Sequence, residues 1–187
     1  MSRLRHFFRH EIELWEDIRG FFSTAFGKDK RPPAISYSHP RYGTFEDAGE
    51  FSYSLHTSVE VTWLGEPVEF SPDATPGTRE RGSEIIEASF DTMDALMEDQ
   101  AGWHDKARAA VLAETYPLWR DEWRDPETEP ELTEDEFWSR ITLTNVTTGE
   151  DGWFSLTFHV EGELLTDHAI CVSGSIAAGV EDVAIEG

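Results

Sequence analysis

The sequence predicts an α+β fold in which helices cover one face of a mainly antiparallel sheet. Two segments, residues 51–70 and residues 141–185, alternate apolar and polar residues with the period of a half-buried strand. Between them, from Phe90 to Trp119, apolar residues recur every three or four positions, which is the spacing of an amphipathic helix. Each element then has one apolar face, and layering the helices on the sheet buries all of these faces together.

We predict an extra amphipathic, aromatic-rich helix in residues 1–31, ahead of a single α+β domain in residues 34–187. Its apolar residues are mostly three or four positions apart, and Gly27 followed by Pro32-Pro33 would end it. Such a helix could pack on its own domain or a second copy, bind another protein, or lie on a membrane. Acidic residues on its polar face make membrane contact the least favoured of these.

The first alternating segment predicts a hairpin or meander with a turn at Gly65-Glu66. Its apolar positions are Phe51, Tyr53, Leu55, Val59, Val61, Trp63, Val68 and Phe70. Residues 71–82 are rich in proline, glycine and charge and predict a loop. In the helical segment that follows, we expect Gly102 to form a kink or break and Pro117 to end the run.

The last 47 residues have the clearest strand pattern and predict a four-stranded antiparallel meander. Alternation places Phe154, Leu156 and Phe158 on one face of its second strand. We further expect that these three residues cannot all be buried together with Ile170 and Val172.

The chain is strongly acidic, with 38 Asp and Glu against 15 Lys and Arg and a net charge of -23. The first 31 residues hold seven basic and five acidic residues, so the whole of the acidic excess lies in the rest of the chain. This acidic body disfavours nucleic acid and anionic membranes as partners, because binding phosphates requires Lys and Arg. Acidic residues occur in every segment, which favours the interpretation that they form a generally solvated surface. The alternative is that an acidic face docks a basic protein.

The densest run of one charge, residues 121–136, is the predicted contact surface for a basic protein partner. Its two prolines prevent one continuous helix and leave the segment displayed. Thr133 and Glu136 form a capping box that predicts a short helix through Arg140. The carboxylates assigned to the binding surface are Asp121, Glu122, Asp125, Glu127, Glu129, Glu131, Glu134 and Asp135.

The common catalytic and cofactor motifs are missing from the sequence. It has no glycine-rich phosphate loop, no nucleophile elbow, no H-E-x-x-H and no cysteine cluster, so we expect no cofactor and a non-enzymatic role. His159, Asp167 and His168 are the one combination that could hold a divalent metal, if their strands pair. The favoured interpretation is that His159 and His168 are hydrogen-bonded sheet histidines at the edge of the core and bind no metal. His39 and His104 show no partner, and we expect them in a turn and on a helix surface.

The single cysteine, Cys171, excludes an internal disulfide and is interpreted as a small buried thiol. No stretch has the 18 or so apolar residues of a membrane span, and acids interrupt any N-terminal signal region. We therefore expect a cytoplasmic protein.

Short motifs across about residues 38–187 resemble an uncharacterised bacterial domain family. They are His39-Pro40-Arg41-Tyr42-Gly43, Trp63-Leu64-Gly65, the capping box within Leu132–Phe137, the turn Asp151-Gly152, and Asp167-His168-Ala169-Ile170. The chain departs from the family pattern at Leu165-Thr166-Asp167, where an aromatic residue and a glycine usually precede the histidine. Related domains occur among the immunity genes that accompany bacterial polymorphic toxins. The resemblance implies a protein that neutralises a basic toxin, and it carries over no catalytic residue.

Three hypotheses for function remain open. The first is an acidic cytosolic binding protein of immunity type. The second is an accessory protein that uses residues 1–31 for homo-oligomerisation or membrane contact. The least favoured is a metal-dependent enzyme built on His159, Asp167 and His168.

Overall fold

The computed structural model of the chain describes residues 36–46, 58–73, 82–162 and 164–187, all within one compact unit that spans residues 35–187. The helix predicted for residues 1–31 lies outside the described residues, as do the first apolar positions of the predicted hairpin, at 51, 53 and 55.

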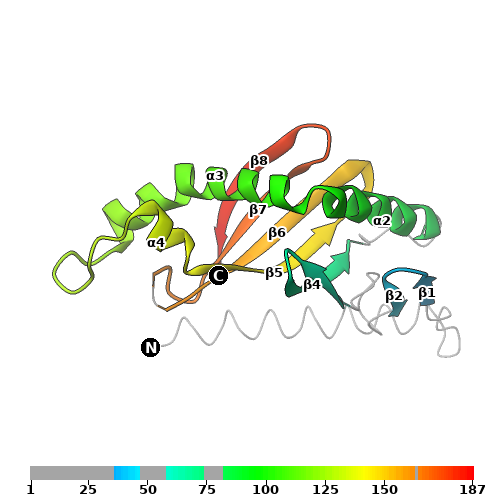
Figure 1. Ribbon diagram of the computed structural model, residues 1–187, viewed down its shortest axis with the longest axis horizontal. Coiled ribbons are helices and arrows are strands. Elements are labelled where there is room, and N and C mark those ends of the chain that lie inside the picture. The colour runs from blue at the N-terminus through cyan, green and yellow to red at the C-terminus, as the bar shows by residue number, and fades with distance from the viewer. Residues whose placement is uncertain (1–35, 47–57, 74–81, 163) are drawn as a thin grey trace, which may run out of the picture. The chain divides into compact units, whose positions relative to one another are not determined.

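The core of the described unit is one six-stranded sheet with the strand order β3-β4-β5-β6-β7-β8 (Figure 1). Its strands are β3 (Val59–Trp63), β4 (Glu66–Pro72), β5 (Ile141–Thr148), β6 (Trp153–Val160), β7 (Ala169–Ser175) and β8 (Gly179–Glu186). A short 3-10 turn, η3 (Glu150–Gly152), joins β5 to β6. The β3-β4 hairpin and the four-stranded meander β5 to β8 both match the prediction. The α+β class with a mainly antiparallel sheet is confirmed.

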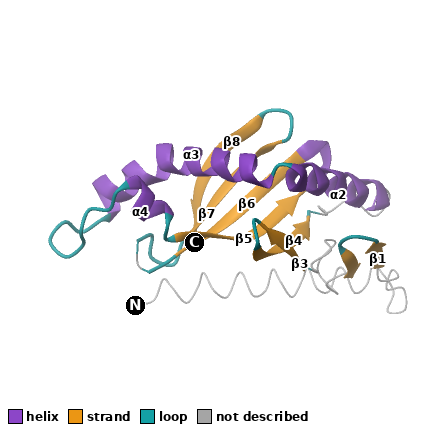
Figure 2. Ribbon diagram, viewed as in Figure 1, coloured by secondary structure: helices purple, strands orange, loops and turns teal. Residues whose placement is uncertain are grey.

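The hairpin and the meander are joined by a parallel pairing of β4 with β5, in which Glu69 lies opposite Asn145 and Pro72 opposite Thr148. Parallel neighbours require a long crossover connection. Here the crossover consists of α2 (Gly82–Glu98), α3 (Gln100–Leu118), the π-helix η2 (Trp119–Trp123) and α4 (Glu134–Trp138). Figure 2 shows these helices on one side of the strands. A separate two-stranded hairpin, β1 (Ser36–His39) and β2 (Gly43–Glu46), precedes the main sheet.

The helices differ from the prediction at two points. The first helix begins at Gly82, before the apolar periodicity becomes clear at Phe90. The break between α2 and α3 falls at Asp99, whose carboxylate accepts the amide hydrogen of Gly102 at 3.1 Å and caps α3. A Cβ on residue 102 would lie 2.2 Å from Asp99 Oδ2, so the glycine leaves space for the cap.

Pro117 lies inside α3, which ends one residue later at Leu118, one residue before the predicted end at Trp119. Proline cannot donate a backbone hydrogen bond, so the helix must rearrange locally. The chain continues as η2, closed by a hydrogen bond of 2.8 Å from the Arg124 amide to the Trp119 carbonyl, five residues back. The α-helix therefore ends soon after Pro117, as predicted, and the helical backbone continues as η2.

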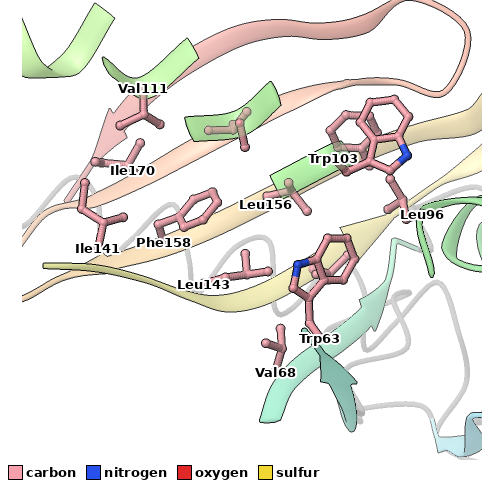
Figure 3. Close-up of a cluster of buried hydrophobic side chains, with 14 of the residues drawn as sticks. Trp63, Val68, Leu96, Trp103, Val111, Ile141, Leu143, Leu156, Phe158 and Ile170 are labelled. Atoms are coloured by element: carbon pink, nitrogen blue, oxygen red, sulfur yellow. The ribbon is translucent and has the colours of Figure 1, made fainter. Parts of the chain in front are cut away.

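The face of the sheet beneath the helices is apolar and closely packed. Phe154, Leu156, Phe158, Ile170 and Val172 are all fully buried. Phe158 lies opposite Ile170 and Leu156 opposite Val172 in the β6-β7 register, so all of them point to the same face. The expectation that they could not be buried together is wrong. Figure 3 shows Leu156, Phe158 and Ile170 on the sheet, with Val111 and Trp103 among the side chains packed with them.

Candidate functional site

The predicted acidic surface is held at both ends by buried aromatic residues. At its start, Trp119 is fully buried in η2, and at its end Phe137 is fully buried in α4. The two rings pack with their centroids 5.2 Å apart, and Tyr116 packs edge-on against Phe137 at 5.4 Å. The Tyr116 hydroxyl donates to the Leu132 carbonyl at 2.7 Å. The loop between Trp119 and Phe137 therefore has both of its ends fixed by packed aromatic side chains.

Several of its carboxylates shape the loop locally. Asp125 accepts hydrogen bonds of 2.9 Å from both the Glu127 amide and the Thr128 hydroxyl, and these bonds lower the pKa of its carboxyl. Asp121 accepts from the Arg120 guanidinium at 2.7 Å, which lowers the pKa of that carboxyl as well. Asp135 pairs with Arg108 of α3.

The capping box predicted at the start of α4 is confirmed. Glu136 donates its amide hydrogen to Thr133 Oγ1 at 3.3 Å and accepts the Thr133 amide at 2.8 Å. The Thr133 amide, together with the Thr133 hydroxyl at 2.9 Å, donates to the Glu136 carboxylate and lowers the pKa of that carboxyl. The helix itself ends at Trp138, two residues before the predicted end.

Arg124 is the internal support of the acidic loop. Its side chain is only 15% exposed and lies 3.9 Å from Glu131, between Nη2 and Oε2. Its Nη1 donates to the Glu129 carbonyl at 3.0 Å, while its buried Nε has no partner among the described residues. A mostly buried guanidinium restrains the Glu129 carbonyl and the Glu131 carboxylate beside it, so Glu129 and Glu131 belong to the framework of the loop.

The remaining carboxylates of the acidic surface face solvent and do not hold the loop. Glu122, Glu127 and Glu134 are exposed, and within the described part of the chain their side chains take part in no hydrogen bond or ion pair. The sequence predicted eight equivalent acids. The structure separates these three from those that hold the loop.

An exposed tryptophan follows Glu122 at the end of η2. Trp123 is 37% exposed and packs edge-on against His168, with ring centroids 5.3 Å apart. The Nδ1 atom of His168 lies 2.8 Å from Thr166 Oγ1 and 2.9 Å from the Leu165 carbonyl oxygen. We refer to Trp123, Thr166 and His168 as the Trp123 corner.

Two uncommon backbone conformations meet at the Trp123 corner. Thr166 has a φ of 55°, a region that β-branched residues rarely occupy. Trp123 itself belongs to the π-helix η2, a conformation that is often found at functional sites. Strained backbone that persists in a fold is a reason to look for function there.

The three residues considered for metal binding are not brought together. His159 is exposed on the face of β6 opposite the buried Phe158, while His168 precedes β7 and turns toward Trp123. Asp167 is exposed in the turn before β7. Nowhere in the described ranges do three or more His, Cys, Asp or Glu side chains form a group that could hold a metal ion.

A second polar cluster, which sequence reasoning missed, fastens the β1-β2 hairpin to α2. His39 is the last residue of β1, and its ring stacks on Phe90 with centroids 4.3 Å apart. Arg41 Nη1 donates to Asp94 Oδ1 at 2.6 Å, and the Tyr42 hydroxyl donates to the same oxygen. Burial, followed by this hydrogen bond, raises the pKa of Tyr42. A phenol held protonated in this way anchors the hairpin and does not supply a nucleophile.

A comparison with protein-family models identifies the part of the chain that belongs to a known family. The model of a bacterial protein family, described as an uncharacterized protein conserved in bacteria (DUF2262), matches residues 46–185. The chain belongs to this family. No curated protein and no solved structure matches the chain.

The DUF2262 match confirms the predicted membership of an uncharacterised bacterial family. It includes the sheet, α2 to α4, the acidic surface and the Trp123 corner, whereas His39-Pro40-Arg41-Tyr42-Gly43 lies before its first residue. In the described residues, no helix has the length and apolar character needed to cross a membrane.

Proposed function

We propose that this DUF2262 domain is a non-enzymatic binding domain that docks a basic protein through its acidic surface. The observation that carries the proposal is that Glu122, Glu127 and Glu134 are exposed and unpaired in the described structure, on a segment that also carries the exposed Trp123. Neutralisation of a basic toxin is the most specific form of this function. It is supported by the resemblance to immunity domains and by the net charge of -23.

The carboxylates and the tryptophan contribute to binding in different ways. Exposed charges add little to affinity one by one, but together they steer an oppositely charged partner and raise the rate of association. Tryptophan is enriched among the few residues that dominate binding energy, and its face attracts Lys and Arg side chains. We therefore expect the three glutamates to set the association rate and Trp123 to set the dissociation rate.

The test compares two triple charge reversals with the same net change. The first is Glu122→Lys, Glu127→Lys and Glu134→Lys on the acidic surface. The second, on exposed strand positions, is Glu60→Lys, Glu69→Lys and Glu181→Lys. Neither set includes the glutamates that contact Arg124, so the loop keeps its internal support.

The measurement is stopped-flow association with a basic partner protein that binds the wild-type chain, at low and high salt. We expect the first set to slow association by roughly tenfold or more at low salt and to flatten its salt dependence. The second set should have a much smaller effect. Trp123→Ala should speed dissociation with little change in association. Equal slowing by both sets would show that the acidity acts as an overall charge, and the proposed surface would be abandoned.

A further inference from the structure

The half-buried histidine on α3 is a titratable group that the binding surface does not use. His104 was expected on a helix surface, but its ring packs edge-on against Trp138 of α4, with centroids 5.3 Å apart, and lies 6.4 Å from Phe158 of β6. Trp138 and Phe158 also pack on each other at 5.5 Å. His104, on α3, therefore contacts both α4 and the sheet.

The imidazole is suited to this position only in its neutral form. Its Nδ1 atom is buried and has no hydrogen-bond partner among the described residues. A neutral imidazole can leave this nitrogen unprotonated, whereas the imidazolium carries a hydrogen on both nitrogens. Protonation would thus bury a charged donor with no acceptor, which is costly in an apolar environment.

The charges around His104 come from its own helix and from α4. Asp105 and Arg108 are its charged neighbours on α3, and they act on it in opposite senses, while Arg108 is in turn paired with Asp135 of α4. The β6 contact, Phe158, is apolar, and the next residue, His159, lies on the opposite face. Burial is the largest influence and lowers the pKa of His104, with Arg108 acting in the same direction and Asp105 against it.

We propose that His104 is a pH-sensitive contact whose neutral imidazole holds α4 against α3 and whose protonation releases α4. The protonated ring would leave Trp138 for solvent. Because α4 ends the acidic surface, its release would loosen the Glu134 side of that surface. The consequence for partner binding rests on the proposed function, but the release of α4 does not.

The sign of the pH dependence follows from the lowered pKa. A histidine whose pKa is lower in the folded state stabilises the fold fully above its unfolded pKa of about 6.5, and the contribution is lost as pH falls through the folded pKa. Each unit by which the contact lowers the His104 pKa raises the ratio of released to held α4 about tenfold. The full change is reached at a pH low enough to protonate His104 in both forms.

The experiment uses the full chain without a partner. Proton NMR titration of the seven histidines locates the His104 resonance by its loss in His104→Phe. Hydrogen exchange of residues 134–138, expressed as protection factors, is followed from pH 7.5 to 5.5. We expect His104 to titrate below pH 6.5 and α4 protection to fall in the wild type. His104→Phe, which keeps a ring at the contact, should remove most of that fall.

His159→Phe is the matched control, because this histidine is exposed on the opposite face of the sheet, and it should behave like the wild type. His104→Gln serves as a second variant that cannot titrate if the phenylalanine does not fit. A His104 pKa at or above 6.5, or an unchanged pH response in the His104 variants, would overturn the proposal. Partner association measured over the same pH range separates the two ideas. If α4 is released while binding stays constant, the pH-sensitive contact stands and the docking surface does not.

Discussion

A methyl group added at Gly174 should separate two strands of the sheet. Gly174 lies in β7 opposite Val180 of β8, next to a register shift between Ser173 and Gly174. A Cβ built at this position would lie 2.0 Å from the Gly179 carbonyl oxygen and 3.0 Å from the Val180 Cα. Both atoms belong to the backbone, so no side-chain rotation can relieve the contact.

The size of the effect follows from the movement that is needed. An ordinary contact begins at 3.4 Å, so the Gly179 carbonyl must retreat far enough to break its pairing with Ser175 and that of Val180 with Gly174. Lost hydrogen bonds cost about 0.5–1.5 kcal/mol each and overpacking about 1–3 kcal/mol, so we expect Gly174→Ala to lower the free energy of unfolding by roughly 3 kcal/mol.

Urea denaturation followed by far-UV circular dichroism measures this loss, and Gly162→Ala is the control. Gly162 has a φ of 75° and nothing within 4 Å of a built Cβ, so alanine there meets conformational strain without a clash. That strain should cost about 1 kcal/mol. If Gly174→Ala destabilises the protein no more than Gly162→Ala, the hairpin yields freely and the reasoning from the backbone contact is refuted.

Two further predictions concern the base of the acidic surface and the single thiol. Thr133→Ala removes the cap of α4 and should lower the free energy of unfolding by about 1 kcal/mol, whereas Thr133→Ser should retain most of it in the same urea assay. Burial raises the pKa of Cys171, with Glu186 adding to the rise and the Thr157 hydroxyl opposing it. Less thiolate is then present at pH 8, so iodoacetamide should alkylate the native protein more slowly than the urea-unfolded chain, and equal rates would contradict this.

Local patterns in the sequence were sufficient to predict the strands of the six-stranded sheet and the cap of α4. The alternation that predicts β6 depends on residues two positions apart, and it matches Phe154, Leu156 and Phe158 on the buried face. The capping box likewise needs only Thr133 and Glu136, three positions apart. Such patterns can be read without knowing the rest of the fold.

Contacts between distant parts of the chain left no comparable pattern. The parallel pairing places Glu69 opposite Asn145, and nothing local to either residue indicates the other. The β1 and β2 strands have four residues each, too few to show a clear period. Likewise, the partners of Asp94 and His104 lie on other elements, so their roles are visible only in the folded chain.

The acidic surface divides into residues that hold it and residues that face outward, a division that charge counting could not reveal. Arg124 holds the Glu129 carbonyl, Asp125 holds the Glu127 amide and the capping box closes the start of α4, and together these bonds fix the loop despite its like charges.

The position of this surface follows from the topology of the sheet. The parallel pairing of β4 with β5 forces a long crossover, and α2 and α3 use most of it to cover the apolar face. The residues between η2 and α4 have no strand left to cover, yet both ends of the segment are held by the packing of Trp119 on Phe137. A loop held in this way can change its outward side chains at little cost to the core. Glu127, in this loop, and Glu122 and Glu134, at its two ends, are therefore the positions at which the proposed binding surface could be matched to a partner while the fold is kept.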